Sequence, residues 1–510
     1  MKDPAGRLLV ILLIGSMPQA LRGQSQQTAS TDDATTMRME EKLESISAAL
    51  TATRQQLEES QRQIEQLHEE LSQMRKQPGV STSVPATGSA VADSQPTTGG
   101  DLKERVEILE TQVKLHDQIK VESNSKYPIR VSGLVLLNAF INRGAVDNID
   151  LPTVALQPPF GTTGSTGATM RQTIIGVEGF GPRIAGAKTS ANVSFDFFGG
   201  LPYSNYVTAA GIARMRTASI HMDWERDSLE GGMETPLISP LSPTSYAMVA
   251  EPAMAWAGNL WTWAPQLRYA HRFVRANEQH FQVEAGLWDP PAPGANVTDT
   301  FRVPSPSERS GQPGYEGRVS YGSVDSRGFE FGAGGYYSRQ TYPTTTASGA
   351  PYTFGNNSWA VTTDWRLPIA RRFELTGEGY RGQSLGGLGG GVYKDVLSGT
   401  NPITGAPVIR GLNDIGGWTQ LKSRFGRSLE ANTSIGQDNG FAGDFHAVVL
   451  PVTSTASQLR ARNRMLDANV IYRPKTYLIF SPEYRRIWTW PIYGARNTAN
   501  IFTLSVGYQF

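Results

Sequence analysis

The sequence predicts an all-β transmembrane barrel of about 16 antiparallel strands, preceded by an N-terminal α-helical coiled coil. Three observations lead to this prediction. The segments after Tyr127 alternate apolar and polar residues, the connections between them alternate in length, and a heptad repeat of apolar residues precedes them. A period of two places alternate side chains on opposite faces of a strand. In a membrane barrel one of these faces meets lipid and the other meets water.

The predicted strands are the segments in which polarity alternates: 129–141, 170–179, 187–198, 212–224, 228–234, 261–273, 279–288, 315–323, 328–338, 358–367, 372–381, 416–425, 428–436, 461–472, 476–488 and 500–510. Connections after even-numbered strands are short, such as 225–227 and 426–427, and most of the others are long. Short periplasmic turns alternating with long external loops are typical of bacterial barrels. Both ends of the barrel are therefore expected in the periplasm.

The last segment shows the alternation clearly, with large residues at every second position: Phe502, Leu504, Val506, Tyr508 and Phe510. An edge strand of a soluble sheet would look the same in isolation. A terminal aromatic on such a strand resembles the signal by which outer-membrane barrels are recognised for assembly. Phe510 is therefore the predicted barrel-assembly signal, and the barrel-assembly machinery is an expected partner.

Aromatic residues are also expected in two belts at the membrane interfaces. The predicted external belt contains Trp261, Trp263, Trp288 and Trp488, and the periplasmic belt contains Trp224, Trp365, Tyr508 and Phe510.

Residues 1–23 have the pattern of a secretory signal peptide. Lys2 and Arg7 precede the apolar run 8–14, which is too short to span about 30 Å of hydrocarbon. The sequence has no cysteine, so a lipoprotein anchor, disulfides and thiolate metal sites are excluded, and no cofactor or metal is expected. A net charge of +1 argues against nucleic acid as a partner.

Residues 37–77 form a predicted coiled coil, because apolar residues recur in heptads. Its seam contains Leu43, Ile46, Leu50, Leu57, Ile64, Leu67 and Leu71. A single amphipathic helix packed on a core is the alternative. A Ser/Thr/Pro/Gly linker follows at 78–100, then a short second coiled segment at 101–121 and the barrel at 128–510.

The order of signal peptide, coiled coil, linker and barrel, together with the segment 231–240 (Gly-Gly-Met-Glu-Thr-Pro-Leu-Ile-Ser-Pro) and the terminal Phe510, resembles the DcaP-like trimeric outer-membrane porins. The chain is more distantly similar to the phosphate-selective porins O and P. The resemblance covers residues 37–510. It implies a homotrimer in the cell outer membrane, with a periplasmic coiled coil, that lets small, often anionic, solutes diffuse.

The third external loop, 234–260, is rich in proline and apolar residues. In general porins the corresponding loop folds inward and narrows the pore. The alternative is packing on the trimer axis or on a neighbouring loop. Selectivity follows from charges in the lumen, and strand facing predicts the pore-lining residues Arg268, Arg272, Arg318, Arg366, Lys422, Arg424, Glu374 and Glu378, with Glu251 from the loop. Mutual pairing of these charges to hold the wall is the alternative role.

Five arginines near the external ends of strands alternate in step with the lipid-facing residues, so their side chains are expected to point toward lipid: Arg214, Arg216, Arg460, Arg462 and Arg464. They are positioned to meet lipopolysaccharide phosphates, unless a β-bulge shifts their facing. His221 and Asp223 share a strand face, but they do not define a nucleophile or a water-activating geometry. The chain is therefore not expected to be an enzyme.

The sequence thus predicts a porin for passive diffusion of small hydrophilic solutes, with a mild anion preference from Arg268, Arg272, Arg318 and Arg366. Expected partners are outer-membrane lipid and lipopolysaccharide, two further copies of the chain, and small anionic or neutral solutes. The alternative is a structural tether, in which the coiled coil joins the outer membrane to the cell wall and peptidoglycan is a partner.

Overall fold

The structure, a computed structural model, describes residues 127–510 apart from 159–162, 201–210, 275–278, 292–302, 324–327, 347 and 455–457. The predicted signal peptide, coiled coil, linker and second coiled segment lie outside the described residues. None of the helices in the described part of the chain has the length and apolarity that a bilayer-spanning helix needs.

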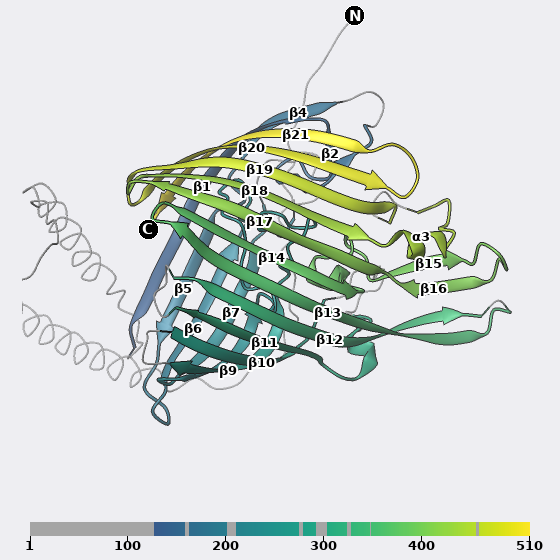
Figure 1. The fold of residues 1–510 in the computed structure, drawn as a ribbon, viewed down its shortest axis with the longest axis horizontal. Helices are drawn as coiled ribbons and strands as arrows, with labels where there is room; N and C mark the ends of the chain where they lie inside the picture. The colour runs from purple at the N-terminus through teal and green to yellow at the C-terminus, as the bar shows by residue number, and fades with distance from the viewer. Residues whose placement is uncertain are drawn as a thin grey trace, which may run out of the picture. The chain divides into compact units, whose positions relative to one another are not determined.

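Nearly all the regular elements of the described residues are strands (Figure 1). The elements in chain order are β1 (Ile129–Arg143), β2 (Ala145–Val146), β3 (Ala155–Leu156), β4 (Gly164–Thr169), β5 (Ile174–Phe180), β6 (Lys188–Asp196), β7 (Arg214–Asp223), β8 (Asp227–Glu234), β9 (Ala264–Val274), β10 (Gln279–Trp288), η1 (Glu308–Ser310), β11 (Gly314–Ser323), β12 (Glu330–Thr345), β13 (Pro351–Ala370), β14 (Phe373–Gln383), η2 (Gly386–Leu388), β15 (Val396–Thr400), β16 (Pro407–Gly411), β17 (Asn413–Phe425), β18 (Leu429–Gly440), α3 (Ala442–His446), β19 (Arg460–Lys475), β20 (Leu478–Pro491) and β21 (Asn497–Gln509).

Seventeen of these strands form one antiparallel sheet that closes on itself, because β21 pairs with β1. The strands β4 and β5 pair with successive halves of β1 and so share one position, which leaves sixteen positions in the barrel. The predicted sixteen-strand antiparallel barrel is confirmed. Closure pairs every strand on both sides, so the sheet has no open edge.

The two faces of the sheet differ in the way that the alternation predicts. On β18, Asn432 and Ser434 point inward and are buried, whereas Ile435 points outward and is exposed. On β21, Ser505 is buried in the interior, while Phe502 and Leu504 lie on the outer face. The barrel therefore has a polar inner wall and an apolar outer surface, as membrane barrels require.

The predicted bounds of the second strand, 170–179, are wrong. Residues 170–173 form a turn in which the Thr173 N–H donates to the Met170 carbonyl at 3.0 Å, and β4 lies before this turn. The six residues of β4 (Gly-Ser-Thr-Gly-Ala-Thr) have no apolar alternation. They are a strand because the 15-residue β1 extends past β5 and its backbone groups need a partner.

The predicted external aromatic belt is also wrong at three positions. The ring of Trp263 lies 5.3 and 4.7 Å from the guanidinium groups of Arg214 and Arg216, which face the interior. Trp261 and Trp288 are 6% and 1% exposed, and they lie inside the barrel rather than at a lipid interface. Trp288 belongs to an interior apolar cluster with Tyr336, Tyr380 and residues of two loops. The apolar core of this molecule thus lies within the barrel, where the loops that connect strands fold inward.

Candidate pore constriction

The connection between β8 and β9, residues 235–263, folds into the barrel and is named here the constriction loop. It contacts the inner wall on strands far from its own two ends. The Ser245 hydroxyl donates to Glu483 of β20 at 2.5 Å, and the Asn469 amide of β19 donates to the Thr244 carbonyl at 2.9 Å. The Thr244 N–H donates to Gln420 of β17 at 3.2 Å. The loop therefore crosses the interior, as predicted for the third external loop.

Polar side chains of the wall hold the backbone of the constriction loop. Gln172 donates to the Ala247 carbonyl at 2.9 Å and accepts from the N–H groups of Val249 at 2.7 Å and Ala250 at 3.1 Å. Gln172 is fully buried. A loop inside a barrel cannot leave its backbone groups unpaired without a cost of about 1–3 kcal/mol for each. Side chains of this kind therefore make the inward path possible.

Glu378, predicted to line the pore, is one of these anchors. Its carboxylate accepts from the Ser239 hydroxyl, from the Leu241 N–H at 2.7 Å and from Trp418 Nε1 at 3.3 Å. The side chain faces the interior from β14 but the constriction loop covers it, so that it is only 5% exposed. Its main role is to anchor the loop.

Apolar residues of the constriction loop pack on apolar residues of the wall. Met248, Ala250, Ala253, Met254 and Ala257 form a cluster with wall residues that include Trp418, Met465, Ile487 and Ile501. The loop and wall approach so closely that a Cβ at Gly436 would overlap the Ala257 carbonyl oxygen. The apolar composition of the loop is explained by this burial.

A second inward segment, residues 384–395, is named here the glycine-rich loop. Its Leu388 carbonyl accepts from the Trp261 N–H at 2.9 Å, and its Gly387 carbonyl accepts from the Thr262 hydroxyl at 2.5 Å. The rings of Tyr393 and Trp256 meet edge to face at 4.7 Å. The two loops thus support each other. The inward path of this segment is not among the sequence predictions, and the glycine-rich run at 386–391 is the signal that indicates it.

Arg318 lies in the wall but is neutralised. Its guanidinium donates to Asp364 at 2.9 and 2.7 Å, to Glu284 at 2.8 Å and to Glu330 at 3.0 Å, and the residue is 5% exposed. Four charge-assisted bonds to three carboxylates make this a cross-link between strands. A solute would meet little of its positive charge.

The other predicted pore-lining bases remain partly exposed on the inner face. Arg268 donates to Glu230 at 2.9 and 2.6 Å, and Arg272 donates to Gln282 at 3.0 Å. Arg424 pairs with Glu374 at 3.3 Å. Arg366 and Lys422 are half-buried near the ends of β13 and β17 that meet the short turns. Apart from Arg268, these bases lie toward the short-turn side of the barrel.

Arg214 and Arg216 face the interior, which corrects their predicted lipid facing. The register between β6 and β7 shifts at Ser194/Phe195, so the bulge alternative is the right one. Arg214 donates to Asp196 at 3.0 and 2.6 Å, and Arg216 donates to Asp196 at 3.1 Å. They also donate to the loop carbonyls of Ala250 and Val249, each at 2.7 Å. Two bases sharing one acid give this end of the constriction loop a local positive charge.

His221 contacts polar side chains on the inner face of the barrel. His221 lies 2.9 Å from both Asn192 and Ser219 and 3.5 Å from Glu230. Within the described ranges, no three His, Cys, Asp or Glu side chains are grouped as metal ligands would be.

Comparisons with known proteins give a structural likeness without a close sequence relative. No protein-family model matches the chain, and no curated protein matches it. The crystal structure of the outer membrane channel DcaP of Acinetobacter baumannii matches with a TM-score of 0.54 and 14% identity, over 76% of this chain and 99% of that chain. This chain shares the fold of the DcaP channel.

Two further porin structures match with lower scores. The anion-selective porin from Comamonas acidovorans gives a TM-score of 0.46 and 9% identity, over 76% of this chain and 100% of that chain. OmpF of Salmonella typhi, in complex with daunomycin, gives a TM-score of 0.44 and 11% identity, over 76% of this chain and 99% of that chain.

The constriction loop of this DcaP-like barrel carries a titratable group of its own. Burial raises the pKa of Glu251 from its ordinary value of 4.5 to about 7, although a hydrogen bond from Trp256 Nε1 at 3.1 Å partly opposes the rise. Asp147, Arg214 and Asp196 also act on this group. Because the buried site favours the protonated acid, the docked loop is most stable below about pH 4.5 and loses this stability as the pH rises to about 7.

We therefore expect the constriction loop to loosen between pH 5 and pH 8, and the variant Glu251→Gln to lose a large part of this response. The raised pKa corresponds to about 3 kcal/mol, which is enough to change loop populations measurably. Current noise and closure rates of single channels in planar bilayers measure the effect. Asp395, whose pKa burial also raises to about 7, titrates in the same range. Asp395→Asn is therefore the control and should retain part of the response. An equal pH response in Glu251→Gln and the wild type would contradict the assignment.

Proposed function

We propose that this chain is an outer-membrane porin through which small hydrophilic solutes diffuse passively. The observation that carries the proposal is the constriction loop, which crosses a barrel with a polar inner wall and is anchored to that wall by hydrogen bonds such as those of Glu378 and Gln172. A barrel that served only as a membrane anchor would need no such narrowing. The fold shared with the DcaP channel supports the same function.

We further propose a weak preference for anions, because the bases near the constriction are more exposed than the acids that pair with them. The side chains of Arg214 and Arg216 are 25% and 14% exposed, while that of Asp196 is fully buried. For Arg268 and Glu230 the values are 26% and 11%. A solute passing this wall meets the guanidinium edges first. In a confined pore such charges act with little screening.

The proposed assembly is a homotrimer in the outer membrane, with the predicted coiled coil of residues 37–77 in the periplasm. The support is the heptad repeat, which provides an association device outside the barrel. The barrel-assembly machinery is the proposed partner during insertion, and peptidoglycan is a proposed neighbour of the coiled coil.

Purified protein in planar bilayers should give ohmic current steps that close in threes. Replacing Arg214 and Arg216 by glutamine should move the reversal potential under a salt gradient toward cation preference, because Asp196 then lacks a countercharge. The matched control is Arg462→Gln with Arg464→Gln, two arginines on the outer face of β19, and it should leave the reversal potential unchanged. A shift in the control but not in the inner pair would show that the facing is wrong.

Deletion of residues 30–125 separates the porin from the tether alternative. A channel should retain its conductance per barrel, since all sixteen strand positions are supplied by residues 129–509. If the deletion abolishes conductance of folded barrels, the N-terminal region is part of the pore. If it weakens envelope integrity while conductance is intact, the tether role gains support.

A further inference from the structure

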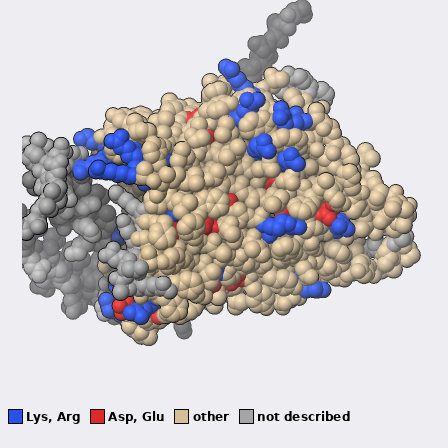
Figure 2. Space-filling view, viewed as in Figure 1, with Lys and Arg blue, Asp and Glu red and all other residues tan. Residues whose placement is uncertain are grey.

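The outer surface of the barrel carries a group of arginines that the porin function does not use. The group, named here the outer arginine patch, lies on β19, β20, β1 and the β20–β21 loop: Arg143, Arg462, Arg464, Arg486 and Arg496. Arg486 of β20 and Arg143 of β1 are both paired with Asn500 of β21. The two arginines therefore lie in one row, on either side of that strand. Figure 2 shows basic side chains gathered over this part of the surface.

Neutral groups hold these side chains in place. Arg462 donates to Asn439 at 2.5 Å, and Arg464 donates to Gln437 at 2.9 and 2.6 Å. The guanidinium groups of Arg462, Arg464 and Arg496 lie 5.4–5.7 Å from the ring of Trp490. Similar contacts join Arg486 to Trp488 at 5.1 Å and Arg143 to Phe502 at 5.7 Å.

The patch lacks a countercharge from the described residues. None of its five arginines forms an ion pair there, whereas the inward arginines Arg214, Arg268 and Arg318 all do. Among the carboxylates on the described strands, Asp227 is the one that points to the outer face. It lies beside a short turn on the opposite side of the barrel. Several guanidiniums without a countercharge on a membrane-facing surface favour the binding of an external anion.

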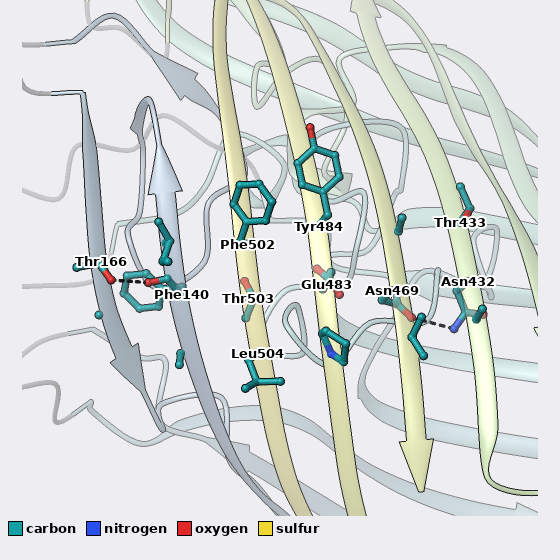
Figure 3. Close-up of a pocket in the computed structure, with 17 residues that line it drawn as sticks. Phe140, Thr166, Asn432, Thr433, Asn469, Glu483, Tyr484, Phe502, Thr503 and Leu504 are labelled. Atoms are coloured by element: carbon teal, nitrogen blue, oxygen red, sulfur yellow. Dashed lines mark hydrogen bonds between the residues drawn. The ribbon is translucent and has the colours of Figure 1, made fainter.

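An apolar groove of about 760 Å³ lies on the outer face directly beside the patch (Figure 3). Tyr484, Phe502 and Ile141 form one row of its lining, and this row is two residues along the strands from the row of Arg486 and Arg143. Two strand residues span about 6.6 Å. Small residues such as Ala468 and Ala139 form the groove floor between larger side chains. A cationic row thus borders a groove that suits a hydrocarbon chain.

We propose that this surface binds a phosphorylated lipid of the outer leaflet, lipopolysaccharide, with its phosphates on the outer arginine patch and one acyl chain in the groove. Guanidinium groups pair with phosphate oxygens through two parallel hydrogen bonds. The patch lies toward the long loops, which is the external side in barrels of this kind. A second copy of the chain fits less well, because the outward strand faces of the described residues offer no carboxylate at this height. The inference is independent of the proposed porin function.

Native mass spectrometry of the full-length protein with added deep-rough lipopolysaccharide tests the proposal. The triple variant Arg462→Gln, Arg464→Gln and Arg486→Gln should bind the lipid at least about tenfold more weakly, since three guanidinium groups that would pair with the phosphates are lost. The matched control is Arg339→Gln, an outward arginine on β12 whose partner is Asn357, and it should bind as the wild type does. Ala468→Trp keeps every charge but fills the groove, and it should also weaken binding.

Heat-modifiable mobility in gels confirms that each variant is folded before binding is measured. Undiminished lipid binding by the folded triple variant would overturn the proposal. If that variant also dissociates into single chains, the patch is instead an interface between copies. Replacement of the same three arginines by lysine should restore only part of the binding, because lysine keeps the positive charge but cannot form the two parallel hydrogen bonds.

Discussion

The anchoring of the constriction loop to the inner wall is the interaction on which the rest of this structure depends. A loop of almost thirty residues enters the barrel only because wall side chains replace the water that its backbone would otherwise bind. The amide groups of Gln172, Gln420 and Asn469 and the carboxyl groups of Glu378 and Glu483 supply these hydrogen bonds. The apolar side chains of the loop then pack on Trp418, Met465 and Ile487, so the interior acquires a core that a simple open barrel lacks.

Because the loop contacts the inner wall, only some of the charged side chains of the wall are available to a solute. Glu378 and Glu483 are acids of the inner face, but they are occupied by the loop. Arg318 is occupied by three carboxylates. The charges available to a solute are those left partly exposed, and Arg214, Arg216 and Arg268 are such bases near the constriction. A count of lumen charges that treats every inward residue alike therefore misjudges the field in the pore.

Much of the barrel could be predicted from the sequence because strand facing has a period of two and needs only local information. The number of strand positions and the alternation of short and long connections follow from that pattern, while the inward direction of the third loop is predicted by its proline-rich, apolar composition. The direction in which Arg214 and Arg216 point could not be predicted in the same way. A bulge at Ser194/Phe195 exchanges the inner and outer positions of the strand, and such a bulge depends on the pairing between strands. Trp261 and Trp288 look like interfacial residues by position, yet non-local packing with the glycine-rich loop places them inside. The pairing of Arg318 likewise depends on carboxylates from three other strands.

The most direct test of the account is the single-channel conductance of a barrel whose constriction loop has been shortened. Replacing residues 240–258 by a short glycine-serine linker removes the segment that crosses the interior but leaves all sixteen strand positions. The account predicts a folded, heat-modifiable barrel with a clearly larger conductance and a reversal potential closer to zero under a salt gradient. An unchanged conductance in the folded variant would contradict the claim that this loop sets the pore.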